Sequence, residues 1–375
     1  MPVFDFQLEC PVHDSFRVRQ VTGMFDLAPE HVGRASIRAD LPGPDEPWTI
    51  GIIVGPSGSG KTSVAKHAFP EAYGKQTHPW PENAALVDGF PQRSIREITS
   101  ALTAVGLSSP PAWLRPYSCL SRGEQFRADL ARTLMENDSL AVVDEFTSVV
   151  DRTVAKIGSA AVSRAIRQRR LAKRLVAVSC HYDILEWLEP DWVLDMATGQ
   201  LARGRLRRPR IQLDIVRCHH SAWRLFRKHH YLSSTMSTAC ECYLATYHGE
   251  PVAFCALMAA AGRKGRWRIS RLVVLPDYQG IGIGTKLADS LAADYTAKRR
   301  GVNLTTSHPA MIAALRHSPR WKAVRVQANG YGVQSGHRSG RIPYYAPSIS
   351  QGRPVVTFQF TDDARQGAIS QESMP

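Results

Sequence analysis

The stretch RWRISRLVVLPDYQGIGIGTKLADSLAADYTAKRRG, Arg266–Gly301, decides the fold of the second half of this chain. Residues 268–275 are rich in β-branched and other apolar side chains, which predicts a strand. A glycine loop over 276–284 follows, and residues 285–298 predict a helix that carries Leu287, Ala288 and Leu291 on one face. A glycine loop that opens a helix presents backbone N–H groups and the positive end of the helix dipole. The stretch therefore suits a phosphate.

Three interpretations of this loop compete. A dinucleotide fold would have a G-x-G-x-x-G order, whereas the order here is Gln279-x-x-Gly282-x-Gly284. A structural turn is possible because glycine-rich turns between strand and helix are common. The third interpretation, which we prefer, is that the segment resembles the acyl-CoA pyrophosphate loop of the GNAT acetyltransferases, with its Q/R-x-x-G-x-G/A pattern.

The GNAT resemblance covers about residues 211–357 and implies acetyl-CoA, or another acyl-CoA, as the cofactor. It implies that the strand before the loop splays from its neighbour and that the pantetheine arm pairs with the backbone of Leu272, Val273 and Val274. The pyrophosphate would lie on the loop and the helix start, at Gln279, Gly280, Ile281, Gly282, Ile283, Gly284 and Thr285. Upstream, two predicted strands joined at His248-Gly249-Glu250 form a hairpin that is common early in that fold.

The segment CHHSAWRLFRKHHYLS, Cys218–Ser233, indicates which class of acceptor receives the acyl group. Together with SHPAM at residues 307–311, it resembles the phage Mom-type DNA modification proteins, a divergent GNAT branch that alters adenine bases. His230 and Tyr231 are then candidates for the catalytic pocket, with Asp277, Arg271 and Ser307 nearby. Acyl transfer to an amine needs a base with a pKa near neutrality and a donor for the developing thiolate, and histidine and tyrosine are suitable types.

Other interpretations of this segment stay open. The histidines can serve as a helix cap and a solvated face, and Trp223 and Phe226 can be ordinary core residues. A metal site is conceivable, although no ligand spacing stands out among Cys218, His219, His220, His230, Cys240 and Cys242.

The first half contains a second glycine loop, in TIGIIVGPSGSGKTSVAKHAF at residues 49–69. G-x-x-x-x-G-K-[ST] after an apolar strand predicts a loop that holds ATP, although a glycine turn with a chance lysine is the alternative. Lys61 can neutralise phosphates and Thr62 can place its hydroxyl on Mg²⁺. The predicted nucleotide contacts are Gly55, Pro56, Ser57, Gly58, Ser59, Gly60, Lys61, Thr62 and Ser63.

Further motifs follow this loop in order. LAVVDEF at residues 140–146 ends an apolar strand in two carboxylates, which suits Asp144 for Mg²⁺ and Glu145 for polarising the attacking water. LSRGEQFRADLARTL at residues 120–134 resembles the signature turn of the ATP-binding cassette (ABC) ATPases. Four residues match that turn: Ser121, Gly123, Glu124 and Gln125. Arg122 departs from it, because the family often has glycine at this position.

The ABC resemblance covers about residues 18–202 and implies the roles of three more residues. Asp151 would lie in the dimer-contacting loop, His181 would be the switch histidine after a strand, and Gln92 would belong to the Q-loop. The family also implies a head-to-tail homodimer through the ATPase domains, with each ATP between one protomer's phosphate loop and the other's signature turn.

The sequence thus predicts an α/β chain in which a P-loop ABC-type ATPase domain, residues 1–205, precedes a GNAT-fold α/β acyltransferase domain, residues 206–357. The basic, turn-prone segment at residues 203–210, with Gly204 and Pro209, separates the two. Past Phe360 the chain turns polar, and we expect residues 358–375 to be a disordered tail.

Composition bounds the partners. Among 375 residues, 47 Lys and Arg against 33 Asp and Glu give a net charge of +14, which favours a polyanion. We expect nucleic acid, DNA rather than RNA. Seven scattered cysteines do not predict a disulfide framework or a zinc ribbon, which fits a reducing cytoplasm. Without a basic leader or an apolar run long enough for a bilayer, we expect a soluble protein with no membrane partner.

Three functions agree with these features. The preferred one is an ATP-hydrolysing, acyl-CoA-dependent acyltransferase that modifies a nucleobase or another amine on nucleic acid. The second is an ATP-regulated acetyltransferase that acts on protein or a small amine. The third is a nucleic-acid-binding ATPase whose GNAT module is not catalytic.

Overall fold

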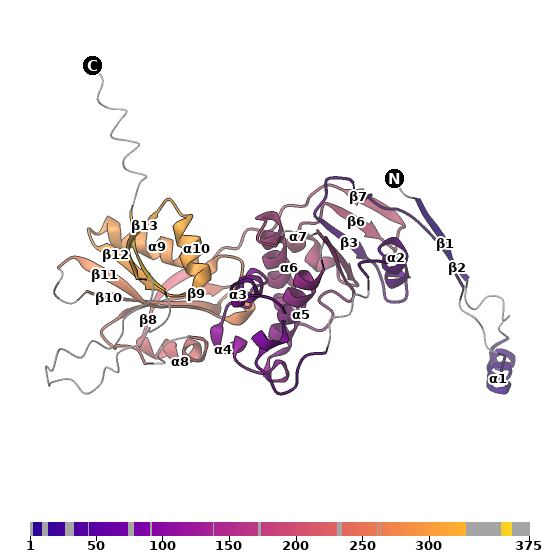
Figure 1. Cartoon of the computed structure of the whole chain (residues 1–375), viewed down its shortest axis with the longest axis horizontal. Coiled ribbons are helices and arrows are strands. Elements are labelled where there is room, and N and C mark those ends of the chain that lie inside the picture. The colour runs from indigo at the N-terminus through magenta and orange to yellow at the C-terminus, as the bar shows by residue number, and fades with distance from the viewer. Residues whose placement is uncertain are drawn as a thin grey trace, which may run out of the picture. The chain divides into compact units, whose positions relative to one another are not determined.

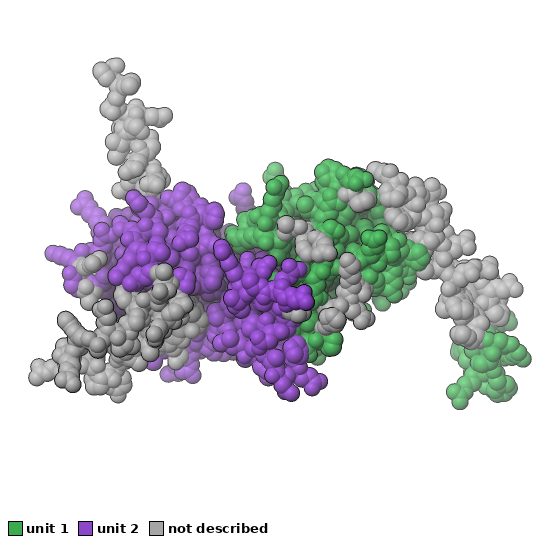
Figure 2. Space-filling model, viewed as in Figure 1, with its two compact units in different colours: residues 1–80, 121–209 green, residues 81–120, 210–375 purple. Residues whose placement is uncertain are grey.

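The computed structural model describes residues 3–9, 14–26, 34–43, 45–73, 79–90, 92–137, 139–171, 174–230, 235–260, 262, 264–327 and 354–361. The chain divides into two compact units, coloured separately in Figure 2. Unit 1 comprises residues 1–80 and 121–209, and unit 2 comprises residues 81–120 and 210–375. Each unit is therefore built from two separate stretches of the chain.

Unit 1 contains a five-stranded sheet in the order β4-β5-β3-β6-β7. Its strands are parallel except for the last pair, β6 and β7. The central strand β3 is buried along its whole length, as expected for an apolar run covered on both faces of a parallel sheet. The bounds are β4 Leu140–Val143, β5 Arg174–Ser179, β3 Ile50–Val54, β6 Trp192–Asp195 and β7 Gln200–Arg203.

The helices of unit 1 begin at clear capping residues. Helix α5, Arg122–Glu136, begins after Ser121, whose hydroxyl accepts from the backbone N–H of Glu124. Helix α6, Arg152–Arg167, begins after Asp151, whose carboxylate accepts from two backbone N–H groups. The other elements of the unit are α2 Lys61–Ala68, α7 Leu185–Leu188, and an N-terminal antiparallel pair, β1 Val3–Glu9 and β2 Arg34–Asp40, with α1 Phe16–Phe25 between its strands.

Unit 2 contains a seven-stranded sheet in the order β13-β14-β12-β11-β10-β9-β8 (Figure 1). All neighbours are antiparallel except β11 and β12, which run parallel. The predicted hairpin between β9 and β10 is confirmed, and His248 and Gly249 both take positive φ at its two-residue turn. The bounds are β8 Asp214–Cys218, β9 Glu241–Tyr247, β10 Glu250–Ala259, β11 Arg266–Val274, β12 Gly301–Thr306, β13 Trp321–Gln327 and β14 Val355–Phe360.

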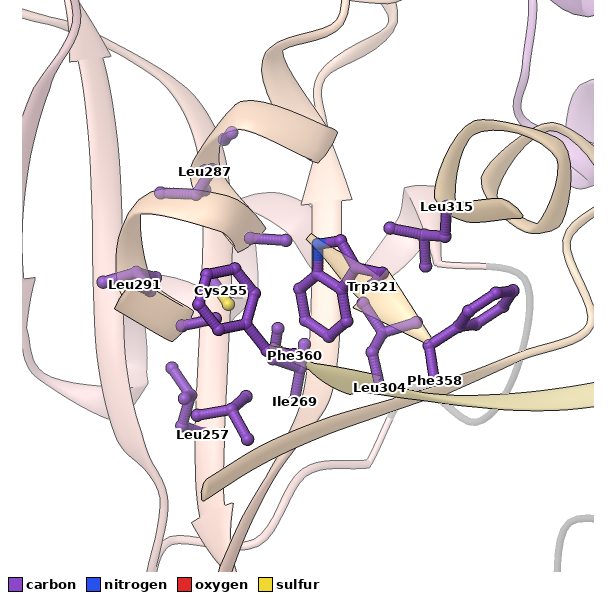
Figure 3. Packing of buried hydrophobic residues seen from close by; sticks show 14 of the residues in the cluster. Cys255, Leu257, Ile269, Leu287, Leu291, Leu304, Leu315, Trp321, Phe358 and Phe360 are labelled. Carbon is purple, nitrogen blue, oxygen red and sulfur yellow. The ribbon is translucent and has the colours of Figure 1, made fainter. Parts of the chain in front are cut away.

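Helices cover both faces of this sheet (Figure 1). Alternate residues of a strand point to opposite faces. Cys255 and Leu257 of β10 pack in a large core with α9, Ile283–Ala297, and α10, Pro309–Arg316 (Figure 3). Phe254 and Ala256 of the same strand pack on the other face against α8, Trp223–Phe226. The segment 81–120 adds α3, Ile95–Ala104, and α4, Pro110–Trp113.

Two features differ from the sequence prediction. Strand β14 continues to Phe360, three residues into the predicted tail, and Phe358 and Phe360 are buried in the main core of unit 2. The predicted boundary at residue 358 is wrong because Phe358 and Phe360 are apolar and bury their rings, and the polar run begins only at Thr361. The segment 81–120, which we expected within the ATPase domain, groups with unit 2. Among the described residues, no helix is long and apolar enough to cross a membrane.

Candidate functional site

The central feature of unit 2 is the divergence of its two parallel strands. Residues 266–269 of β11 pair with residues 301–304 of β12, and the pairing stops there. After Ile269, residues 270–274 of β11 pair with β10 and with no other described strand. The splay expected from the GNAT resemblance is therefore present, and it creates a strand edge inside the sheet.

The direction of the backbone groups along this edge follows from one hydrogen bond. The N–H of Leu275 donates to the carbonyl of Val252, at 2.9 Å, so Leu275 faces β10. Backbone groups alternate sides in an antiparallel pair, so Val273 also faces β10 while Leu272 and Val274 face the splayed side. The carbonyl of Val274 accepts from Nε2 of Gln279 at 2.9 Å. The N–H groups of Leu272 and Val274 and the carbonyl of Leu272 therefore face the open side of the splay.

A β-bulge marks the point where the strands separate. In the pairing with β10, Arg271 lies opposite Ala256 and Ile269 lies opposite Leu257, so Ser270 is the extra residue. The Ser270 hydroxyl donates to the carbonyl of Ala256 at 3.2 Å. The bulge bends β11 away from β12 and directs Arg271 to the face that carries α8.

The glycine loop connects the end of this strand to α9. Gly282 precedes the helix with φ of 91°, a left-handed conformation that disfavours other residues. Gly284 permits close approach to the strand, because a Cβ atom there would lie 3.3 Å from Cγ2 of Val274. The N–H groups of Ile283, Gly284 and Thr285 are in the first turn of α9 and have no intrahelical acceptor. Together with the N–H groups of Gly280 and Ile281, they are donors of the kind that suits an anion at a helix N-terminus.

Aromatic and basic side chains lie on the opposite face of the sheet. The ring of Trp223 is 5.5 Å from the ring of His230, and Cζ of Arg271 is 6.0 Å from the Trp223 ring centroid. Trp223 and Phe226 are buried in the smaller core, which confirms their packing role. Tyr231 lies outside the described residues. His230 and Arg271 thus each lie near the Trp223 ring.

The remaining predicted residues of this unit take separate places. Asp277 follows β11 with an exposed side chain, and Ser307 follows β12 and is partly buried. Nδ1 of His219 accepts from the N–H of Ser221, so this histidine is a helix cap. Among the described residues, no group of three or more His, Cys, Asp or Glu side chains could hold a metal. Burial raises the pKa of the Cys218 thiol, and it raises that of Cys242 to about 11, which keeps both thiols protonated.

In unit 1, the predicted phosphate loop lies between β3 and α2. Gly60 precedes α2 with φ of 84°, and Nζ of Lys61 donates to the carbonyl of Pro56 at 2.6 Å. The hydroxyl of Thr62 donates to Oδ2 of Asp144 at 2.9 Å. The structure therefore brings together the two residues that were predicted to hold Mg²⁺, which are 82 positions apart in the sequence.

Strand order explains this convergence. Strand β5 lies between β3 and β4, and all three are parallel, so their carboxyl ends meet at one edge of the sheet. Glu145 follows β4 with an exposed side chain, and His181 follows β5 after Cys180. The hydroxyl of Ser179 donates to the carbonyl of Phe146 at 2.9 Å and accepts from the N–H of His181 at 3.2 Å. It thus connects the two turns.

Tyr73 is a contact that the sequence analysis missed. Its hydroxyl donates to Oδ2 of Asp144 at 2.6 Å, the same oxygen that Thr62 contacts. Burial and this carboxylate raise the pKa of Tyr73 to about 12. Tyr73 lies in a turn and belongs to no motif, so only the structure reveals its contact with the predicted metal ligand.

The predicted signature turn forms the start of α5. The Glu124 carboxylate accepts from the backbone N–H of Ser121 at 2.8 Å, and the side chain is buried, so it completes a capping box. Gly123 is in the first turn of the same helix. Gln92 has positive φ, an exposed side chain, and a place in unit 2 rather than unit 1.

Comparison with known proteins finds a family match for one part of the chain. Residues 208–316 match the family model of the Acetyltransferase (GNAT) family. No curated protein matches the chain. Three solved structures illustrate the similarity, each covering about two fifths of this chain. The IAA acetyltransferase from Bacillus cereus is 15% identical, over 40% of this chain and 98% of that chain, with a TM-score of 0.29. A Bacillus subtilis acetyltransferase in complex with CoA is 12% identical, over 40% of this chain and 97% of that chain, with a TM-score of 0.30. A GNAT family acetyltransferase from Elizabethkingia anophelis with acetyl-CoA bound is 14% identical, over 39% of this chain and 96% of that chain, with a TM-score of 0.30.

The matched residues include the splayed strands, the bulge and the glycine loop. The C-terminal region of this mixed α/β chain is therefore a GNAT acetyltransferase domain, matched over residues 208–316.

Proposed function

We propose that the chain is an acyl-CoA-dependent N-acyltransferase whose site lies at the splay between β11 and β12. The observation that carries this proposal is the edge at residues 270–274, which is followed directly by the glycine loop and the N-terminus of α9. An acyl-CoA has an extended arm with amide groups and a pyrophosphate. A strand edge suits the first and a helix N-terminus suits the second.

The residues of the chain have distinct roles in this proposal. The N–H groups of Leu272 and Val274 and the carbonyl of Leu272 hydrogen-bond the arm, and the amides from Gly280 to Thr285 hold the pyrophosphate. When bound, the thioester supplies the activated acyl group. The acceptor enters from the face that carries Trp223, where His230 takes the proton of the attacking amine and Arg271 attracts an anionic acceptor. Tyr231, Asp277 and Ser307 are further candidates for positioning the acceptor or protonating the leaving thiolate.

For unit 1 we propose binding and hydrolysis of ATP with Mg²⁺. The supporting observation is the hydrogen bond between Thr62 and Asp144 at the carboxyl edge of the sheet, beside the phosphate loop. Glu145 would polarise the attacking water, and His181 would contact the γ-phosphate. The resemblance of the turn at Ser121 to the ABC signature supports a head-to-tail homodimer, in which that turn covers the partner's ATP.

The acceptor that we favour is an amine of a nucleobase in DNA. The net charge of +14 supports it, and so does a local excess of arginine in unit 1. Burial, together with the like charges of Arg170 and Arg208, lowers the pKa of Arg164. These neighbouring positive charges repel one another, so a phosphate backbone would stabilise them.

A stepwise experiment tests these proposals. Thermal unfolding with and without acetyl-CoA tests the cofactor, because a ligand that binds only the folded state raises the midpoint. The protein is then incubated with duplex DNA and acetyl-CoA, with and without ATP, and the digested nucleosides are analysed by mass spectrometry. An acylated nucleoside is expected. If acetyl-CoA raises the midpoint but DNA and RNA stay unmodified, a protein or small-amine acceptor is favoured instead. If acetyl-CoA does not raise the midpoint, the third function is favoured, in which the GNAT module is not catalytic.

ATP hydrolysis has its own test. Lys61→Ala should abolish nucleotide binding, whereas Glu145→Gln should retain binding and lose turnover by about a hundredfold or more. Phosphate release and nucleotide binding are measured on both variants. Unchanged phosphate release by both variants would remove the ATPase assignment without affecting the acyltransferase one.

A further inference from the structure

A turn from the segment 81–120 contacts the proposed acyl-CoA loop inside unit 2. The backbone N–H and the hydroxyl of Ser108 both donate to Oε1 of Gln279, at 2.9 and 2.8 Å. Gln279 is 171 positions later in the sequence and is the first residue of the Gln279-x-x-Gly282-x-Gly284 pattern in the loop. One side-chain oxygen therefore receives two hydrogen bonds from a single residue.

The other end of the same side chain is also fixed. Nε2 of Gln279 donates to the carbonyl of Val274 at 2.9 Å, and its backbone N–H donates to the carbonyl of Pro276 at 3.2 Å. A glutamine amide can donate only through its nitrogen and accept only through its oxygen. The donors of Ser108 and the acceptor carbonyl of Val274 therefore require the same orientation of the Gln279 amide. Gln279 thus connects the last residue of β11 to Ser108.

The third polar group of Ser108 reaches the other strand of the splay. The carbonyl of Ser108 bonds Nε2 of His308 at 2.8 Å, and a neutral imidazole donates there when Nε2 carries the proton. His308 precedes α10, and its own N–H donates to the hydroxyl of Thr306, the last residue of β12. The N–H, hydroxyl and carbonyl of one residue therefore bridge the ends of β11 and β12.

The turn that presents Ser108 is well supported. The N–H of Leu107 donates to the carbonyl of Leu102 at 2.8 Å, and the indole N–H of Trp113 donates to the carbonyl of Leu107 at 2.8 Å. Leu107 and Trp113 are buried, and the Trp113 ring lies 6.2 Å from the His308 ring. A turn held at both flanks can transmit its position to the loop.

We propose that Ser108 is a positioning residue for acyl-CoA binding: it fixes Gln279 and His308 so that the two strand ends hold the spacing that the pantetheine arm and the pyrophosphate require. This inference rests on the proposed function. It assigns to a segment outside the GNAT match a direct part in forming the cofactor site. Without the Ser108 hydroxyl, the loop amides would be less ordered before the ligand arrives, and binding would have to order them.

The test compares three variants of the full chain. Ser108→Ala removes only the hydroxyl, and one hydrogen bond at a partly buried site corresponds to roughly a fivefold to tenfold weaker affinity. Ser108→Thr keeps the hydroxyl and should restore binding. Ser94→Ala removes a hydroxyl of the same segment that caps α3 through hydrogen bonds with Glu97, so it is the matched control for loss of local stability.

Two readouts separate positioning from folding. Calorimetric titration with CoA should give the weaker affinity for Ser108→Ala alone, and hydrogen exchange of the ligand-free protein should show faster exchange at residues 279–285 in that variant alone. In acyl transfer, its KM for acetyl-CoA should rise while kcat stays unchanged. If the wild type binds CoA and Ser108→Ala matches it in affinity and exchange, this inference is overturned. If the wild type does not bind CoA, the proposed function fails instead.

Discussion

At the scale of single residues, the two loops that we propose to bind phosphates differ in the side chains that accompany their backbone. Lys61 and Thr62 supply a charge and a hydroxyl beside the first loop, and Thr62 contacts the carboxylate of Asp144. The second loop offers backbone N–H groups, and its leading side chain, Gln279, is engaged in bonds within unit 2. The first arrangement suits a metal-bound triphosphate that reacts, and the second suits a pyrophosphate that is only held.

Substitution of Gly282 should separate cofactor binding from stability. Gly282→Glu forces a side chain into the left-handed region, at a cost of about 1–2 kcal/mol, and places a carboxylate where the pyrophosphate is expected. Gly249→Glu imposes the same conformational cost at a hairpin turn whose Cβ would meet open space. We expect both variants to lose similar thermal stability and only Gly282→Glu to lose the shift caused by acetyl-CoA. An equal shift in both would contradict the loop assignment.

His308 should make the stability of unit 2 depend on pH. Burial lowers the pKa of His308, and the hydrogen bond with the Ser108 carbonyl offsets part of that effect. The unfolded chain therefore takes up this proton at a higher pH than the folded one. The contribution of His308 is complete above its ordinary pKa of about 6.5 and is lost as the pH falls below that value.

The measurement is urea unfolding between pH 5 and pH 8 for the wild type and for His308→Gln, which keeps a donor but does not titrate. The wild type should lose stability towards pH 5 more steeply than the variant. Parallel pH profiles for the two proteins would show that His308 is not the titrating group.

At the scale of elements, the splay depends on two irregularities that lie close together. The pairing of β11 with β12 ends at Ile269, and the bulge at Ser270 follows immediately. The bulge adds local twist to β11, which turns its edge away from β12. The N–H groups of Leu272 and Val274 and the carbonyl of Leu272 then face a side with no neighbouring strand among the described residues, whereas the carbonyl of Val274 accepts from Gln279.

Proline substitutions test this orientation directly, because proline removes a backbone donor. Leu272→Pro removes an N–H that faces the splayed side, so the sheet should keep its pairing while acetyl-CoA affinity falls. Val273→Pro removes an N–H that faces β10 and leaves a buried carbonyl of the ladder without its donor, so it should destabilise unit 2 by about 1–3 kcal/mol. Thermal unfolding with and without acetyl-CoA distinguishes the two. A larger loss of stability in Leu272→Pro would reverse the assigned directions.

The sequence predicts the local elements of both sites well, but it does not predict their distant contacts. The order of strand, glycine loop and helix after Arg266 follows from periodicity and glycine spacing, and the structure confirms it. The hydrogen bond between Thr62 and Asp144 follows from two motifs at the ends of parallel strands. Tyr73 and Ser108 lie in turns without a motif, and their contacts depend on packing between distant segments, for which one sequence has no signal.

At the scale of the whole molecule, the two units have separate cores. The larger core of unit 2 contains Phe358 from β14 and Leu287 from α9 (Figure 3). A core of unit 1 contains Ile53 from β3 and Val176 from β5. Units with separate cores can unfold in separate transitions, and each ligand should stabilise only the unit that binds it.

Calorimetric unfolding should therefore show two transitions, of which acetyl-CoA raises one and ATP with Mg²⁺ raises the other. Phe358→Ala should lower the acetyl-CoA-sensitive transition, in keeping with a loss of about 3–5 kcal/mol for a buried phenylalanine. Ile52→Ala, in the buried centre of β3, is the matched change for the other unit and should lower the ATP-sensitive transition. A single transition shifted by both ligands would show that the units unfold together.

The division of unit 2 into two stretches of chain also determines how the protein responds to a protease. Trypsin has many sites in the exposed, arginine-rich segment at residues 203–210, and one cut there leaves residues 81–120 on the N-terminal fragment. The hydrogen bonds of Ser108 with Gln279 and His308 then join two separate polypeptides. The nicked protein should therefore elute as one species in native chromatography and separate only on denaturation. A C-terminal fragment produced alone would lack part of its own fold.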